Sequence, residues 1–124
     1  AGGMGIASKL FLNGSLEPGI QLIKNLANFD KKIKNTDWII TGEGKLDSQT
    51  LSGKTIQGVL ESAKKQQINV AAFCGKIEMN QKELDSIGIL YADDIMSAAK
   101  DFNDAMKNTT KYLKTITKRF VREL

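Results

Sequence analysis

The sequence predicts an α/β fold built around a βαβ unit. Two short apolar runs, residues 38–41 and 68–74, have the composition of buried strands, and a helical pattern occupies residues 55–67 between them. Strand, helix and strand in this order form the right-handed unit from which parallel sheets are assembled. Glycines and charged residues follow the first run directly. Because open α/β sheets bind ligands beyond the carboxyl ends of their strands, the loop expected at residues 42–54 is the candidate site.

Two helices are expected ahead of the first strand. Apolar residues recur at helical spacing over residues 6–12, and Asn13 and Gly14 favour a helix end because both tolerate the left-handed conformation. Residues 20–29 show the same one-sided apolar spacing. The polar, lysine-rich residues 30–37 indicate a solvated loop or helix end, and they mark the boundary before the strand.

The second half of the chain continues the alternation of helices and strands. Residues 55–67 carry apolar side chains three and four positions apart, which is typical of a helix with one buried side. Residues 80–86 are polar and predict a short helix or turn, and residues 87–91 are a candidate third strand. Asp93 and Asp94 then suit a turn or a helix cap.

An amphipathic helix is expected at the end of the chain. Asp101 and Asp104 resemble a capping box at its start, with Asp in the place of the usual Glu. The face predicted to pack inward is apolar: Met106, Leu113, Ile116, Phe120 and Leu124. The opposite face is basic: Lys107, Lys111, Lys114, Lys118, Arg119 and Arg122. Solvation and the field at a helix C-terminus explain that basic face, and a partner site is the alternative.

Length and composition indicate a globular protein. The 124 residues suffice for one domain or for a piece of a larger protein. Hydrophobic residues make up 41% and charged residues 26%, and no apolar run approaches the roughly 20 residues of a membrane span. The net charge of +4 favours anionic ligands. The basic residues are too scattered, and too little interleaved with aromatic ones, to indicate nucleic acid binding.

Cysteine and histidine usage restricts the available chemistry. The single cysteine, Cys74, excludes an intramolecular disulfide and fits a reducing cytoplasm. The chain has no histidine, so catalytic triads of the Ser-His-Asp or Cys-His type are excluded, as are most zinc sites. Proton transfer must therefore use carboxylates, Lys or Tyr.

The loop after the first strand suits phosphate chemistry without being a P-loop. Residues 53–55 match the end of a Walker A motif, but Ser48 stands where that motif needs its first glycine. Lys54 still supplies a positive charge at a helix start, and Glu43 or Asp47 could bind Mg²⁺ or accept a hydroxyl proton. Three glycines let the backbone approach a ligand: Gly42, Gly44 and Gly53. The alternative is a glycine-rich connection whose carboxylates cap the next helix.

A second candidate anion site is the glycine-rich start of the chain. Gly2 and Gly3 open the first predicted helix, where backbone N–H groups and the helix dipole can face an anion. A tight packing turn is the equal alternative, since these glycines do not complete a GxGxxG pattern.

The central segment resembles the signature of the glycerate kinase family, in the bacterial glycerate 2-kinase type. The resemblance rests on Asp-Trp-Ile-Ile-Thr-Gly-Glu-Gly-Lys-Leu-Asp-Ser-Gln-Thr at residues 37–50, followed by Gly-Lys at 53–54 and Gly-Val at 58–59. It extends in register to further segments: Ala-Gly-Gly-Met-Gly at 1–5, Leu-Glu-Pro-Gly-Ile at 16–20, the second strand with its glycine at 70–75, and the final helix. The departures are Lys45 in place of the usual Arg, and Thr55-Ile56 after the Gly-Lys pair.

The resemblance implies an ATP-dependent kinase that uses Mg²⁺ to phosphorylate D-glycerate, usually at the 2-hydroxyl. It also implies a two-domain enzyme about three times as long as this chain. Residues 1–34 would end an inserted domain, and residues 35–124 would complete a Rossmann-like domain with a three-layer parallel sheet. The family segment Asp-Ser-Phe-Lys-Gly is missing here, so we expect a C-terminal fragment that is inactive alone. A non-catalytic α/β module that binds an anion or merely folds is the alternative, and a homodimer is an open possibility.

The resemblance also suggests roles for individual residues. Asp47 would orient or deprotonate the substrate hydroxyl, Glu43 would hold Mg²⁺ directly or through water, and Lys54 would neutralise phosphate oxygens. Asp47 is a second candidate metal ligand. The residues expected to bind substrate and phosphate are Gly42, Gly44, Gln49, Thr50, Gly53, Gly2 and Gly3.

Overall fold

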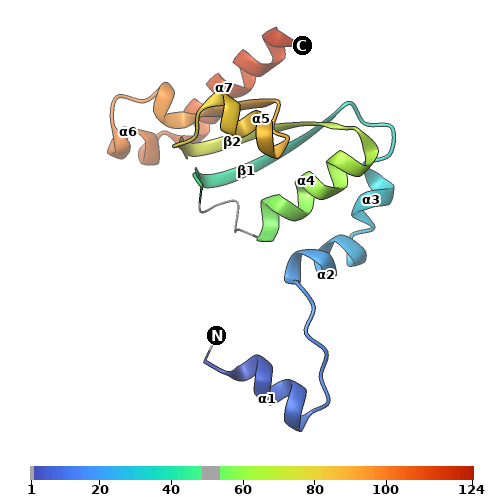
Figure 1. The fold of residues 1–124 in the computed structure, drawn as a ribbon. Helices are drawn as coiled ribbons and strands as arrows, with labels where there is room; N and C mark the ends of the chain where they lie inside the picture. Colours follow the sequence, from blue (N-terminus) through green and yellow to red (C-terminus); the bar gives the residue numbers. More distant parts are fainter. Residues whose placement is uncertain (1, 49–53) are drawn as a thin grey trace.

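The protein is a three-layer α/β structure (Figure 1), seen in a computed structural model that describes residues 2–48 and 54–124. The strands are β1 (Trp38–Leu46), β2 (Asn69–Ile77) and β3 (Tyr91–Asp94). The helices are α1 (Met4–Phe11), α2 (Gly19–Leu26), α3 (Phe29–Lys32), α4 (Lys54–Gln66), α5 (Gln81–Ile87), the 3-10 turn η2 (Ile95–Ser97), α6 (Phe102–Lys107) and α7 (Thr109–Glu123). The three strands are parallel and lie in the order β1-β2-β3, which confirms the predicted α/β class.

The first strand is longer than the sequence predicts. Its pairing with β2 continues past Thr41 through Glu43, opposite Cys74, to Leu46, opposite Ile77. The prediction that a loop begins at Gly42 is therefore wrong. Glycines and charged residues are poor strand formers in isolation, but the ladder of backbone hydrogen bonds to β2 holds them extended.

The third strand begins later than predicted, at Tyr91 instead of Ile87. Asn80 starts α5 with a capping box, because its side chain accepts from the Glu83 N–H while the Glu83 carboxylate accepts from the Asn80 N–H. Gly88 ends the helix with a positive φ of 91°. Residues assigned to a strand thus form a helix end and a connection.

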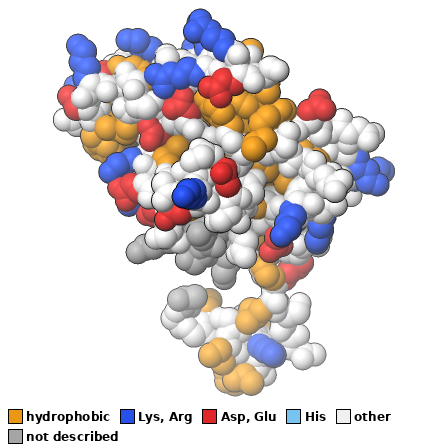
Figure 2. Space-filling view, turned by 45° about the horizontal axis from the view of Figure 1, so that its top comes forward, with side chains coloured by type: hydrophobic (Ala, Val, Ile, Leu, Met, Phe, Trp, Pro, Cys, Tyr) orange, Lys and Arg blue, Asp and Glu red, His pale blue; other side chains and the backbone are white. Residues whose placement is uncertain are grey.

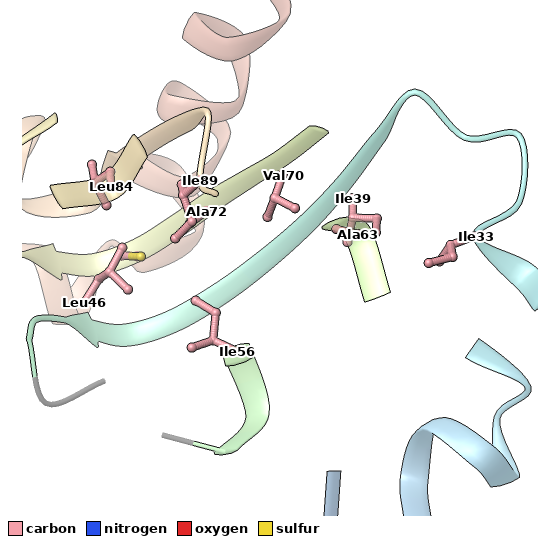
Figure 3. Close-up of a cluster of buried hydrophobic side chains, with 10 residues drawn as sticks. Ile33, Ile39, Leu46, Ile56, Ala63, Val70, Ala72, Leu84 and Ile89 are labelled. Carbon is pink, nitrogen blue, oxygen red and sulfur yellow. The ribbon is translucent and has the colours of Figure 1, made fainter. Parts of the chain in front are cut away.

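One hydrophobic core lies between the sheet and helices α4 and α5 (Figure 3). Ile56 and Ala63 of α4 and Leu84 of α5 pack against side chains of β1 and β2. The apolar spacing predicted for residues 55–67 is confirmed by α4, whose buried residues contact this core. The buried side of α4 therefore covers one face of the sheet formed by β1 and β2.

A second core, with aromatic residues around it, lies on the α7 side of the sheet. Phe120 of α7 packs edge-on against Trp38 of β1 and Phe73 of β2, with ring centroids 5.0 Å and 5.7 Å apart. The predicted inward face of the last helix is only partly correct. Tyr112, Ile116 and Phe120 are buried, whereas Met106, Leu113 and Leu124 are exposed.

The end of the chain forms two helices instead of one. Asp101 caps α6 as predicted, since its carboxylate accepts from the Asp104 N–H at 2.8 Å. The reciprocal half of the capping box is absent, because the Asp104 carboxylate accepts from the Lys100 N–H. The cap predicted at Asp94 is confirmed: its side chain accepts from Ser97 N–H at the start of η2. On the basic face, Arg119 forms an ion pair with Asp93.

Helix α2 packs against α4, and α3 packs against the first core through Phe29. The buried ammonium of Lys24 donates to the Gly58 carbonyl of α4 at 3.0 Å, and Ile20 packs on Gly58. Helix α1 lies apart from the sheet at the end of an extended segment (Figure 1), and its apolar side chains are exposed (Figure 2). None of the described helices is long and apolar enough to cross a membrane.

We predict that Gly75→Ala destabilises the pairing of β1 with β2, whereas Gly44→Ala does not. A Cβ at residue 75 would lie 2.3 Å from the Gly44 carbonyl oxygen, which belongs to backbone and must move. We expect a loss of about 1–3 kcal/mol in the free energy of unfolding, measured by urea denaturation. The matched control is Gly44→Ala, because a Cβ there meets nothing within 4 Å. Equal stability of the two variants would contradict this account of the strand pair.

Candidate functional site

The carboxyl ends of β1 and β2 bring charged residues to one edge of the sheet. Glu43 of β1 lies opposite Cys74 of β2, and Lys45 lies opposite Lys76. Asp47 follows the last residue of β1 and is largely shielded, with 20% of its side chain exposed. Because the strands are parallel, all of these residues lie at the edge where α/β sheets bind their ligands.

Asp47, Lys45, Lys76 and a further residue, Glu78, form an alternating chain of charges. The Lys45 ammonium lies 3.1 Å from the Asp47 carboxylate and 2.8 Å from the Glu78 carboxylate. The second oxygen of Glu78 lies 2.6 Å from the Lys76 ammonium. The pKa of Lys45 is raised by its hydrogen bonds to Glu78 and Asp47, and the pKa of Glu78 is lowered by Lys45 and Lys76. The ion pairs therefore favour the charged forms of both Lys45 and Glu78.

This charge chain contributes more to geometry than to stability. Its lysine side chains are about half exposed, at 51% and 56%, and exposed ion pairs contribute little to the free energy of folding. Its backbone anchor is firmer, since the Glu78 N–H donates to the Leu46 carbonyl at 2.8 Å. Asp47 is therefore paired with Lys45, and Lys45 is in turn held by Glu78 at the end of β2.

A cavity of about 590 Å³ opens beside this edge. Glu43, Gly44, Gly75 and Lys76 line its strand side. Its other walls are mainly apolar side chains of η2, α6 and α7: Met96, Phe102, Met106 and Leu113. A smaller hollow of about 300 Å³ lies between α4 and α5, away from Glu43 and Asp47. We therefore assign the candidate site to the strand-end cavity, where apolar walls meet charged groups.

The structure brings some predicted site residues together at this edge. Gly42, Glu43 and Gly44 belong to β1, and Asp47 follows it directly. Glu43 lines the cavity, whereas Asp47 does not line it and is linked to its wall through the charge chain that ends at Lys76. The carboxylates thus sit at the expected edge, although most of the segment that carries them is strand.

The remaining predicted residues lie elsewhere or outside the described part of the chain. Gln49, Thr50 and Gly53 are outside the described residues. Lys54 is the first residue of α4, and its side chain is outside the description. Gly2 and Gly3 have positive φ values of 54° and 77° at the start of α1, which lies apart from the strand ends (Figure 1). Their part in binding stays a prediction.

The described residues form no closed metal site. Among residues 2–48 and 54–124, no three carboxylate, His or Cys side chains gather in a way that could hold a metal. Mg²⁺ commonly uses one or two carboxylates, with waters and substrate phosphates as the other ligands. Glu43 and Asp47 are single carboxylates of that kind, and metal binding by either residue stays a prediction.

Glu78 and Lys76 are not among the predicted site residues, although the sequence carries a signal for them. Gly-Lys-Leu-Asp at residues 44–47 recurs as Gly-Lys-Ile-Glu at residues 75–78. The structure places these two segments side by side, with Lys45 opposite Lys76 and Leu46 opposite Ile77. Two copies of one short pattern at the ends of two neighbouring parallel strands therefore predict two equivalent charged ends.

We predict that Cys74 is unreactive in the folded protein. The side chain is buried, and burial raises the pKa of its thiol to about 11, with the nearby carboxylates of Glu43 and Asp94 adding to the rise. At pH 8 its reaction with DTNB should be about 100-fold slower than after unfolding, because the thiolate is the nucleophile. Rapid modification before unfolding would contradict the burial of this side chain and would show that the thiol is accessible from the cavity.

The whole chain matches a family described as the glycerate kinase family, over residues 1–124. It is 41% identical over 107 residues to a protein of Bacillus cereus named glycerate kinase, covering 86% of this chain and 28% of that protein. A glycerate kinase of Neisseria meningitidis is 38% identical over 117 residues, with 91% and 30% covered. A glycerate 2-kinase of Escherichia coli is 35% identical over 95 residues, with 77% and 23% covered. The chain thus spans less than a third of the length of these relatives.

Proposed function

Because the chain belongs to the glycerate kinase family, we propose that it carries part of the active site of an enzyme that phosphorylates D-glycerate with ATP. The chain spans less than a third of its relatives, so the activity is proposed for a longer protein that contains this chain. The product is 2-phosphoglycerate, a choice supported by the relative named glycerate 2-kinase. The single buried cysteine suits a cytoplasmic enzyme.

The observation that carries this proposal is the placement of Asp47. Its carboxylate directly follows β1, is mostly shielded from water and lies 3.1 Å from the Lys45 ammonium. Held beside Lys45, it can accept a proton from a substrate hydroxyl, and this chain offers no histidine for that step. Positioning and electrostatics dominate phosphoryl transfer, so the role proposed for this carboxylate is to orient the hydroxyl and take its proton.

The proposed reaction is an in-line transfer of the γ-phosphoryl group. The hydroxyl oxygen of glycerate bonds to the γ-phosphorus while its proton passes to Asp47. The bond between the γ-phosphorus and the bridging oxygen breaks, and ADP leaves. Glu43, on the cavity wall, would hold Mg²⁺, which when bound neutralises phosphate charge. Lys54, at the start of α4, is proposed to approach a phosphate oxygen.

We predict that Asp47→Asn in the full-length protein lowers kcat by at least about 100-fold with the fold intact. The amide keeps the shape of the side chain but cannot take the hydroxyl proton. A coupled assay of ADP release with D-glycerate measures the effect. The matched control is Asp85→Asn, an exposed carboxylate on α5 that accepts a hydrogen bond from Gln81, and it should retain normal turnover. Near-normal turnover of Asp47→Asn would remove this residue from the mechanism.

We also predict that the 124-residue chain alone releases no ADP in the presence of D-glycerate. The strand-end cavity supplies one wall of the proposed site, and the relatives are more than three times as long as the matched segment. The assay compares the chain with the full-length protein at equal concentration. Clear turnover by the chain would show that the 124 residues hold a complete site.

A further inference from the structure

We propose that Glu78, at the end of β2, and Lys45, on β1, hold Asp47 in place for proton transfer. We call these two residues the positioning relay. This inference rests on the proposed function, because it assigns two further residues to the same site. Asp47 and Glu78 occupy equivalent places. Each is the fourth residue of a Gly-Lys-x-acid segment, and the two segments lie side by side at the ends of β1 and β2.

The backbone fixes Glu78 before its side chain acts. Its N–H donates to the carbonyl of Leu46 at 2.8 Å, and that carbonyl belongs to the peptide bond leading into Asp47. Glu78 is therefore tied to the residue immediately before the candidate base. Leu46 itself is completely buried, which anchors the end of β1 on the core.

The carboxylate of Glu78 then holds the ammonium groups of Lys45 and Lys76. Lys45 and Lys76 are opposite each other on adjacent strands, where two ammonium groups repel. Glu78 lies between them, with one carboxylate oxygen 2.8 Å from Lys45 and the other 2.6 Å from Lys76. This arrangement leaves Lys45 directed at both Glu78 and Asp47, and it holds the ammonium 3.1 Å from the Asp47 carboxylate.

The Lys45 ammonium divides its contacts between two carboxylates, those of Asp47 and Glu78. With Glu78 as a second carboxylate partner, the same ammonium orients Asp47 while part of its field is neutralised. Glu78 and Lys45 are therefore positioning residues, and Asp47 remains the group that receives the proton.

The test is a double-mutant cycle in the full-length protein. We expect Glu78→Gln to lower kcat by about tenfold or more while the KM for glycerate changes by less than about threefold, since a misplaced base slows chemistry more than binding. Lys45→Met should lower kcat at least as much, whereas Lys45→Arg, which keeps the charge, should retain most of the wild-type kcat. The double variant Lys45→Met, Glu78→Gln should be no slower than Lys45→Met alone, because both substitutions break one relay.

The matched control is Glu61→Gln, an exposed carboxylate on α4 with no ion pair among the described residues, which should keep wild-type turnover. A wild-type kcat in Glu78→Gln would overturn the relay. So would a double variant whose loss in kcat equals the product of the losses in the two single variants. If the wild-type protein itself phosphorylates no glycerate, the proposed function fails. The relay is then decided by an NMR titration of Glu78, whose lowered pKa should rise in Lys45→Met and would overturn the relay if unchanged.

Discussion

The pairing of β1 with β2 is the constraint on which the rest of the structure depends. It runs from Trp38, opposite Asn69, to Leu46, opposite Ile77, and it continues in the hydrogen bond from Glu78 to Leu46. Near its end the strands approach so closely that residue 75 has no room for a Cβ. This close approach keeps a glycine-rich, charged segment extended, and it places the last residues of both strands within reach of each other.

The chemistry of the candidate site follows from that extension. A loop at residues 42–47 would present Glu43 and Asp47 without a fixed relation, whereas the strand fixes Glu43 in register with β2 and ends at Leu46, directly before Asp47. Glu43 then lies on the wall of the cavity, and Lys45 reaches both Asp47 and Glu78. The polar edge meets apolar walls from α6 and α7, so charged and apolar contacts are available to one ligand.

Local sequence patterns predicted the elements whose own residues determine them. Helix α4 has its apolar spacing within the segment, and the starts of β1 and β2 are continuous apolar runs. The patterns were wrong where a distant or competing contact decides. Glu43 and Lys45 are extended because of β2, Ile87 is helical because Asn80 and Gly88 cap α5, and Leu113 is exposed because α7 turns Tyr112 inward. The Lys45–Glu78 contact joins residues far apart in sequence, and only the repeated Gly-Lys-x-acid pattern indicated it.

The most direct measurement of the central claim is a crystal structure of the full-length protein with D-glycerate and a non-hydrolysable ATP analogue. The account predicts that an Asp47 carboxylate oxygen lies within hydrogen-bonding reach of the acceptor hydroxyl, at about 2.6–3.2 Å, with Lys45 still between Asp47 and Glu78. A glycerate molecule bound away from the carboxyl end of β1, with Asp47 facing only protein groups, would contradict it.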